Sequence, residues 1–145
     1  MPFPKPEPGL VIRYSYLWLE EYKMGREEGV KDRPCAVILV TKTDRDDEIV
    51  TVLPVTHTPP AEPAFALEIP PETKRRLGLD HDRSWIVLTE SNRFIWLGPD
   101  LRPAIGGDPD GVAYGFLPAK FYERMRSKFI AILKSNRAAV APRSG

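Results

Sequence analysis

Three side chains suited to phosphate chemistry, Glu28, Arg33 and Thr56, stand at the two ends of one segment of the chain. A guanidinium such as that of Arg33 presents a planar fork that can hold two phosphate oxygens. A threonine hydroxyl can donate a hydrogen bond to the same group, and a carboxylate can take up a proton. A second interpretation stays open: Arg33 pairs with Asp32 or Glu28, and Thr56 is an ordinary residue at the end of a strand.

The segment that carries Arg33 and Thr56 consists of two apolar, β-branched runs joined by a charged turn at residues 44–48. The runs cover residues 33–40 and 49–56, a length typical of strands, and therefore predict a β-hairpin. Neither run alternates cleanly, so we expect both faces to be covered or the strands to curl into a barrel. Arg33 enters the first strand and Thr56 leaves the second, which places both at the same end of the pair.

The elements around this hairpin are predicted from turn residues and from hydrophobic periodicity. The expected elements are a first strand at 10–18, a long loop at 20–32, a short strand at 65–69, a short helix at 70–78, a strand or strand pair at 84–96, a turn-rich loop at 98–111, a short strand at 114–117 and a long helix at 118–134. The helix at 118–134 carries an apolar stripe, at spacings of three and four residues, that should face the core.

The chain of 145 residues predicts one domain with two flanking segments. Residues 1–8 alternate with proline and predict an extended lead-in. Residues 9–134 form the domain, and residues 135–145, which have no apolar cluster, predict a disordered tail. The many prolines, sixteen in all, disfavour a helical bundle.

Composition excludes several classes of protein. Apolar residues make up 42% and charged residues 28%, a balance typical of soluble domains, and no run is long enough to span a membrane. The N-terminus has no apolar signal segment, and the single cysteine, Cys35, excludes an internal disulfide, so we expect a cytoplasmic protein. Two distant histidines and one cysteine leave no zinc set. A net charge of +1 argues against a strongly basic nucleic-acid coat, although a local basic rim stays possible.

The order of elements and two motifs resemble those of the MazF/PemK (Kid) toxins of bacterial toxin–antitoxin pairs. The first motif is the loop at 28–34, which ends in Arg33-Pro34 and opens the first hairpin strand. The second is the sequence Val52-Leu53-Pro54-Val55-Thr56 at the end of the other strand. The resemblance extends more weakly through residues 85–90 and into the long helix, and covers residues 9–133.

This resemblance implies a mainly β fold with α, an SH3-like small barrel with a short helix and a C-terminal helix. It implies a homodimer that cuts single-stranded RNA without a metal or another cofactor and is held inactive by a cognate antitoxin. Arg33 and Thr56 fall on the arginine and threonine of the family, and Glu28 falls on its acidic loop position. Glu90 stands at the acid of the Arg-x-Asp pair of the PemK branch.

Two departures from the family pattern support an alternative function. Leu88 stands where the PemK branch has its strand arginine, and His57 follows Thr56 where members have a small hydroxyl residue. A proline-rich insert at 59–63 also lies beside the expected site. The alternative is a barrel that binds RNA or an acidic peptide without cleaving it.

The expected site therefore has two sets of residues. The catalytic candidates are Arg33, Thr56, Glu28 and Glu90, with either carboxylate as the base. The candidates for RNA binding are Lys31, His57 and Arg93. His57 has a competing interpretation as a surface or packing residue, Cys35 is expected in the core, and the cations at 74–76 are expected to end a short helix.

The dimer is predicted from apolar surface as well as from the resemblance. Tyr14, Tyr16 and Trp18 alternate on one face of the expected first strand, and contiguous exposed apolar surface usually marks an interface. We therefore expect a homodimer in which the loops at 20–32 border a groove lined by Arg33 and Thr56.

Overall fold

The computed structural model describes residues 5–23, 25, 32–96, 98, 101–102, 111–135 and 139–142. Its elements, in chain order, are β1 (Leu10–Tyr14), α1 (Leu19–Lys23), β2 (Arg33–Lys42), β3 (Glu48–Thr56), the 3-10 turn η1 (Pro63–Phe65), β4 (Ala66–Glu68), α2 (Pro71–Arg76), β5 (Trp85–Val87), β6 (Glu90–Ile95), β7 (Ala113–Phe116), α3 (Ala119–Lys134) and β8 (Ala139–Pro142). None of the helices within these ranges has the length and apolar character that crossing a membrane requires.

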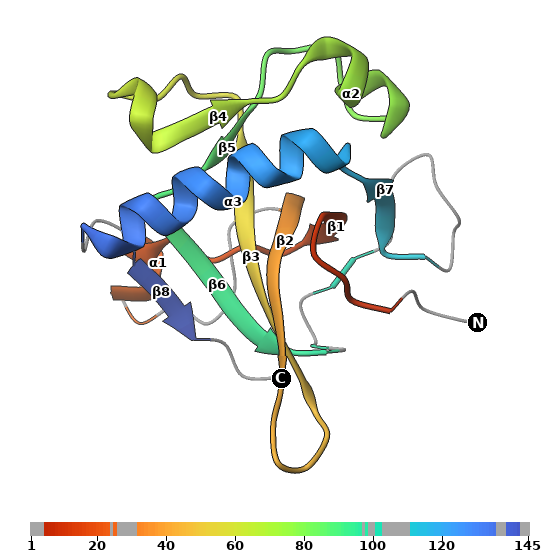
Figure 1. Cartoon of the computed structure of the whole chain (residues 1–145), viewed down its shortest axis with the longest axis vertical. Coiled ribbons are helices and arrows are strands. Elements are labelled where there is room, and N and C mark those ends of the chain that lie inside the picture. Colours follow the sequence, from red (N-terminus) through yellow and green to blue (C-terminus); the bar gives the residue numbers. More distant parts are fainter. Residues whose placement is uncertain are drawn as a thin grey trace.

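The predicted hairpin is confirmed. Strands β2 and β3 pair antiparallel, with Cys35 opposite Pro54 and Lys42 opposite Glu48. The turn of the hairpin projects beyond the other elements, whereas the end at which Arg33 begins β2 lies among them (Figure 1). Arg33 donates a hydrogen bond to the carbonyl of Val55, so the start of β2 and the end of β3 do lie together.

One sheet joins all the strands of the described ranges, in the order β4-β5-β3-β2-β1-β7, with β6 pairing with both β3 and β8. The pairs are antiparallel except for β6 with β8. The mainly β class with helices is therefore confirmed. The sheet does not close on itself in the described part of the chain, and the SH3-like barrel stays a prediction.

The hairpin is covered on both faces, as its lack of alternation predicted. One face of β2 and β3 packs against the apolar stripe of α3 and against the region of α2, in a cluster that includes Ala36, Leu53 and Val55. The opposite face carries Cys35, Val37, Val50 and Val52, which pack against the aromatic residues of β1 and β6. Neighbouring strand residues point to opposite faces, so at the ends of β2 and β3 too, adjacent side chains belong to different faces of the hairpin.

The first strand and its aromatic residues differ from expectation. Strand β1 ends at Tyr14, and Tyr14 and Tyr16 are both completely buried. The Tyr14 ring stacks on Phe94 of β6, with 4.6 Å between the ring centroids. The expected exposed face is therefore wrong, because β6 covers it from a distant part of the sequence. The homodimer loses this supporting observation and stays a prediction.

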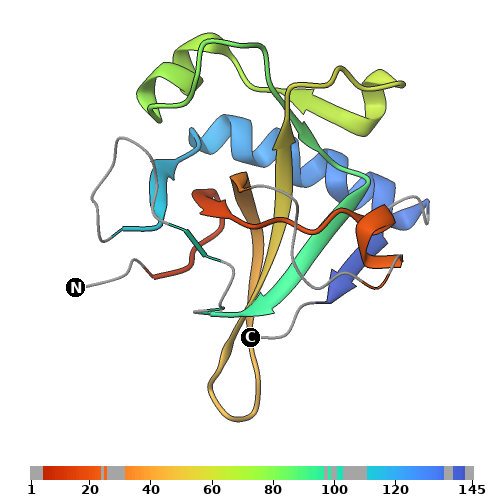
Figure 2. The same cartoon turned by 180° about the vertical axis from the view of Figure 1, so that it is seen from behind.

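The tail also differs from expectation. Residues 139–142 form β8, which pairs in parallel with β6 and buries Ala141, so that part of the tail is not disordered. The side chains of β8, from the sequence Ala-Val-Ala-Pro, are small, so the strand can pair closely with β6. Both views place β8 beside α1, the short helix found within the expected long loop (Figure 2).

Candidate functional site

Arg33 stands at the start of β2, and its guanidinium includes a buried Nε–H group without a described acceptor. Its Nη1 donates to the Val55 carbonyl at 3.3 Å, and its guanidinium lies 4.8 Å from the ring centroid of Trp18. Its Nε is buried and has no hydrogen-bond partner among the residues that the structure describes. A buried donor left without a partner is costly. The side chain is thus held in place by two contacts, while its buried Nε–H has no acceptor among the described residues.

Glu90 begins β6 and lies close enough to Arg33 for the guanidinium to influence its ionisation. Its Oε1 accepts hydrogen bonds from the Tyr16 hydroxyl at 3.1 Å and from the backbone N–H of Leu19 at 2.8 Å. Burial raises the pKa of the Glu90 carboxyl, and this outweighs the lowering by those hydrogen bonds and by Arg33. A carboxylate with a raised pKa takes up a proton more readily, which suits a general base.

Thr56 ends β3 on the same face as these two residues. Extending the register from the pair of Cys35 and Pro54 places Thr56 opposite Arg33, and opposite residues share a face of the sheet. The Thr56 hydroxyl oxygen accepts a hydrogen bond from the N–H of Thr58 at 3.2 Å. That contact leaves the hydroxyl hydrogen free to donate. The structure therefore brings together three of the four catalytic candidates.

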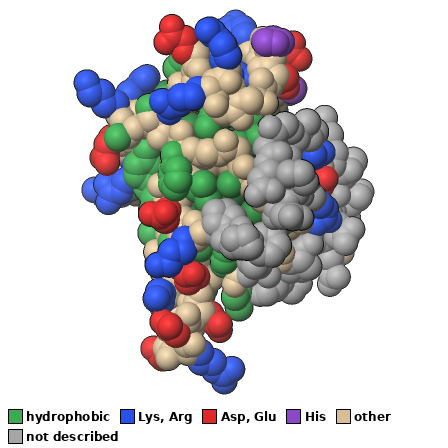
Figure 3. Space-filling model, turned by 90° about the vertical axis from the view of Figure 1, so that its right-hand side faces the viewer, with side chains coloured by type: hydrophobic (Ala, Val, Ile, Leu, Met, Phe, Trp, Pro, Cys, Tyr) green, Lys and Arg blue, Asp and Glu red, His purple; other side chains and the backbone are tan. Residues whose placement is uncertain are grey.

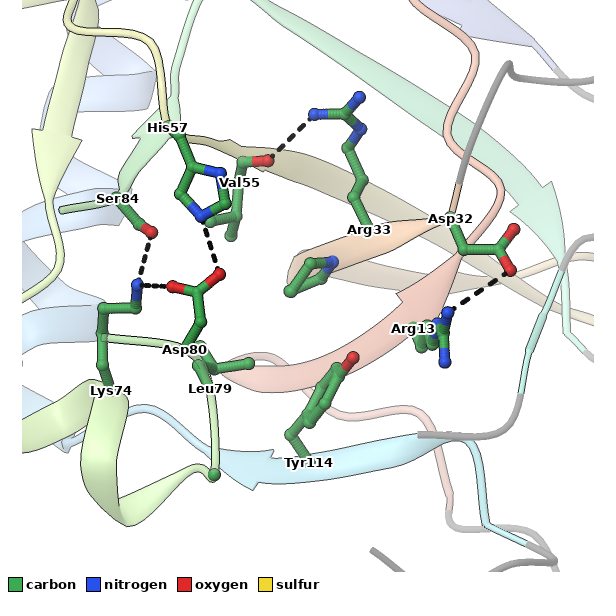
Figure 4. A pocket seen from close by; sticks show the side chains of 12 residues that line it. Arg13, Asp32, Arg33, Val55, His57, Lys74, Leu79, Asp80, Ser84 and Tyr114 are labelled. Carbon is green, nitrogen blue, oxygen red and sulfur yellow. Dashed lines mark hydrogen bonds and ion pairs between the residues drawn. The ribbon is translucent and has the colours of Figure 1, made fainter. Parts of the chain in front are cut away.

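His57 lies on the other face of the hairpin end, since it follows Val55 by two residues and Val55 belongs to the cluster under α3. Its imidazole is exposed, and Nε2 bonds to Oδ2 of Asp80 at 2.8 Å (Figure 4). No described residue bonds to Nδ1. His57 is therefore a surface histidine whose ring is oriented by a carboxylate.

A buried lysine completes this second group of charged residues. Lys74 is only 4% exposed, and its ammonium bonds to Oδ1 of Asp80, to the Ser84 hydroxyl at 2.6 Å and to the Asp82 carbonyl. Burial alone would raise the pKa of the Asp80 carboxyl, but the hydrogen bonds from Lys74 and His57 outweigh it, and the pKa is lowered. We call Lys74, Asp80 and His57 the lysine–histidine chain.

The sequence does not predict the lysine–histidine chain, because Lys74 stands beside Arg75 and Arg76 and fits the pattern of cations that end a short helix. That helix, α2, is confirmed, but it turns Thr73, Lys74 and Leu77 towards the interior. Leu77 follows Thr73 and Lys74 by four and three residues, which puts the three on one side of a helix, and this spacing is the signal that could have indicated a buried lysine.

A cavity of about 410 Å³ lies at this end of the hairpin. Its lining includes Arg13, Arg33, His57, Lys74, Asp80 and Tyr114. Arg33 and His57 therefore border the same space although they come from opposite faces of the hairpin. Histidine side chains lie among acidic and basic ones near the top of the molecule (Figure 3). A cavity of this size can hold a phosphate group with a neighbouring sugar.

A metal ion does not fit the side chains at this cavity. Ligand atoms of His57, Asp80 and Asp82 lie within 4.8 Å of one another, the one such group found in the described ranges. The Lys74 ammonium, however, already bonds to Asp80 and to the Asp82 carbonyl. A divalent cation placed there would lie against a buried positive charge, so we assign no metal to this group.

The remaining predicted residues do not join the site. Arg93 is exposed in the middle of β6, opposite Thr51, which is five residues before Thr56. At about 3.3 Å per residue, Arg93 lies roughly 16 Å from the hairpin end. Glu28 and Lys31 lie outside the described residues. Cys35 is completely buried, which confirms its predicted place in the core.

No protein-family model matches the chain, and no curated protein matches its sequence. The likeness to the MazF/PemK toxins therefore rests on the motif residues of the chain alone.

Proposed function

We propose that this protein is a metal-independent endoribonuclease that cleaves single-stranded RNA, with an SH3-like, toxin-type barrel as its scaffold. The observation that carries the proposal is the position of Arg33 at a strand end shared with Thr56, on the face where Glu90 begins β6. A cation, a proton acceptor and a hydroxyl donor are the groups that phosphate cleavage without a metal requires.

The roles follow from the chemistry of each group. Glu90 takes the proton of the 2′-hydroxyl, which then attacks the neighbouring phosphorus. Arg33 stabilises the negative charge that develops on the phosphorane oxygens, because a guanidinium keeps its charge and offers several donors. Thr56 donates one further hydrogen bond to the same oxygens. An internal nucleophile explains the choice of RNA over DNA, since DNA has no 2′-hydroxyl.

Single-stranded RNA and an antitoxin are the partners of this proposal. Side chains reach unpaired bases and flexible backbone more easily than the deep groove of an RNA duplex. The antitoxin would compete through an acidic segment, because carboxylates present to Arg33 the same charge as phosphates. Such a toxin acts on messenger RNA in the cytoplasm, and its expression should arrest growth.

A second candidate function is a module that binds RNA or an acidic peptide without cleaving it. The contacts of Glu90 favour it, because Oε1 accepts two hydrogen bonds that tie the segment before α1 to β6. A carboxylate in that position can be a structural acceptor alone.

Incubation of the purified protein with a varied panel of single-stranded RNAs in EDTA tests the proposal. We expect fragments with 2′,3′-cyclic phosphate and 5′-hydroxyl ends. Arg33→Lys should lower the rate by about 10²- to 10³-fold, because a lysine cannot offer the same fork of donors. Arg45→Lys at the opposite, exposed end of the hairpin serves as the matched control and should cleave like the wild type.

RNA that is bound but not cut by the wild-type protein would favour the binding module. Cleavage that persists unchanged in Arg33→Lys would show that the RNA reacts at another site.

A further inference from the structure

The two faces of the hairpin end hold proton-transfer groups of opposite kind. Glu90, on the face of Trp18, is a carboxyl whose buried setting favours proton uptake. His57, on the face of α2, is an imidazole with one ring nitrogen bonded to Asp80 and the other free of described partners. Arg33 is related to both: it lines the cavity together with His57, and it shares the face of Glu90 at the same end of the hairpin.

Cleavage of RNA by its own 2′-hydroxyl needs proton-transfer groups on opposite sides of one phosphorus. In an in-line displacement, the attacking and leaving oxygens lie about 180° apart, so the base and the acid must approach from opposite sides. At this end of the hairpin, side chains from both faces border one space, because Arg33 and His57 line the same cavity.

We propose that His57 is the general acid that protonates the leaving 5′-oxygen, opposite Glu90 as the base, with Asp80 and Lys74 as positioning residues; this inference rests on the proposed RNA cleavage. Imidazole is the side chain best suited to proton transfer near neutral pH. Asp80 holds Nε2 and turns Nδ1 away from itself. Lys74 holds Asp80 through its second oxygen and is in turn fixed by Ser84 and Asp82.

The step balances as follows. Glu90 accepts the proton of the 2′-hydroxyl, and the 2′-oxygen forms a bond to phosphorus. The bond between phosphorus and the 5′-oxygen breaks, and that oxygen receives the proton from Nδ1 of the His57 imidazolium. The products are a 2′,3′-cyclic phosphate and a 5′-hydroxyl. The enzyme is left with a protonated Glu90 and a neutral His57, and exchange of one proton with water restores both.

A pair of RNA substrates tests this role. One is ordinary RNA, and the other carries sulfur in place of the leaving 5′-oxygen. A thiolate leaves without being protonated, because a thiol is a much stronger acid than an alcohol. On ordinary RNA, His57→Gln should lower the rate by about 10²- to 10⁴-fold, the range of general acid catalysis. On the sulfur substrate, His57→Gln should cleave nearly as fast as the wild type.

Two further variants separate proton transfer from folding. His81→Gln changes the other histidine, which is exposed and does not border the cavity, and should leave both substrates unaffected. Asp80→Asn should show a smaller loss on ordinary RNA and the same rescue by sulfur, because it loosens the imidazole without removing it. A merely structural role would slow both substrates equally.

Each outcome bears on one of the two proposals. A wild-type protein that cleaves neither substrate overturns the proposed function. A wild-type protein that cleaves, together with a His57→Gln variant that is unimpaired or is slowed equally on both substrates, overturns the assignment of His57 and leaves the proposed function standing.

Discussion

The charged groups on the two faces of the hairpin end differ in their hydrogen bonding and in the direction of their pKa shifts. On the face of Trp18, the Arg33 Nε has no partner in the described part of the chain, and the Glu90 carboxyl has a raised pKa because burial disfavours its charge. On the face of α2, every hydrogen of the Lys74 ammonium has an acceptor, and Asp80 has a lowered pKa because Lys74 and His57 donate to it. The first face thus holds a buried donor without a described acceptor, whereas the buried ammonium on the other face has all its hydrogens bonded.

The contrast separates a buried donor that lacks a described partner from a buried cation whose donors are all bonded. Unpaired buried donors cost free energy in the folded protein, and a bound phosphate would recover it. A fully bonded buried ammonium contributes to stability only while its acceptors stay in place. We therefore expect substitutions on the Lys74 face to change stability first, and substitutions on the Arg33 face to change activity first.

The largest change in stability is expected for Lys74→Ala. The variant removes a buried ammonium, so the hydroxyl of Ser84, a residue only 1% exposed, loses its donor, and the Asp82 carbonyl keeps only the hydrogen bond from Ser84 at 3.3 Å. A buried acceptor left without its donor costs about 1–3 kcal/mol, and the loss of the ion pair adds little because the Asp80 side chain is 51% exposed. Urea denaturation measures this free energy of unfolding. The control Arg75→Ala changes an exposed cation of the same helix, and an equal loss in both variants would contradict the contrast.

Glu90→Gln should have the reverse effect. The rate of RNA cleavage should fall at least about 10²-fold with loss of the base, while the fold persists because a glutamine oxygen can still accept from Tyr16 and Leu19. The pKa of Glu90 is raised in the folded protein. The wild type therefore gains stability when the pH falls through this pKa and Glu90 becomes protonated, and it is less stable at higher pH, where Glu90 is ionised. The variant should therefore be relatively most stable at neutral pH. Urea denaturation at several pH values checks this, and a variant that unfolds more easily at pH 7 would refute it.

Asp80→Asn should cause a smaller and pH-dependent loss of stability. The lowered pKa of Asp80 stabilises the folded protein above the ordinary aspartate pKa, and this contribution disappears as the pH falls through the lowered value. Because the side chain is 51% exposed, solvent screening limits the effect to about 1 kcal/mol. Wild type and variant should differ at pH 7 and converge in acid, as thermal unfolding can show. A difference that grows in acid would exclude this origin.

The smallest effect is expected for Thr56→Val. It removes one hydrogen-bond donor of about 1 kcal/mol, which lowers the rate of cleavage several-fold. Thr56→Ser keeps the hydroxyl and should retain the activity. Kinetics with saturating RNA measure both variants. Equal rates in the valine and serine variants would remove Thr56 from the reaction.

Local patterns in the sequence were sufficient for the hairpin, for the two helices α2 and α3, and for the burial of Cys35. Strand length, periodicity and turn residues act between neighbours in the chain, so the sequence carries them directly. The shared position of Arg33 and Thr56 follows from the hairpin alone, because an antiparallel pair brings the start of one strand to the end of the next.

Contacts between distant segments were decided only by the tertiary structure. The sequence predicts an exposed face for Tyr14 and Tyr16, but in the structure β6 covers it. The sequence also predicts a disordered tail, but residues 139–142 pair with β6. The burial of Lys74 likewise depends on the segment that brings Asp80, Asp82 and Ser84 around its ammonium. A single sequence does not reveal such pairings, because the free energy that fixes them arises when two remote surfaces exclude water together.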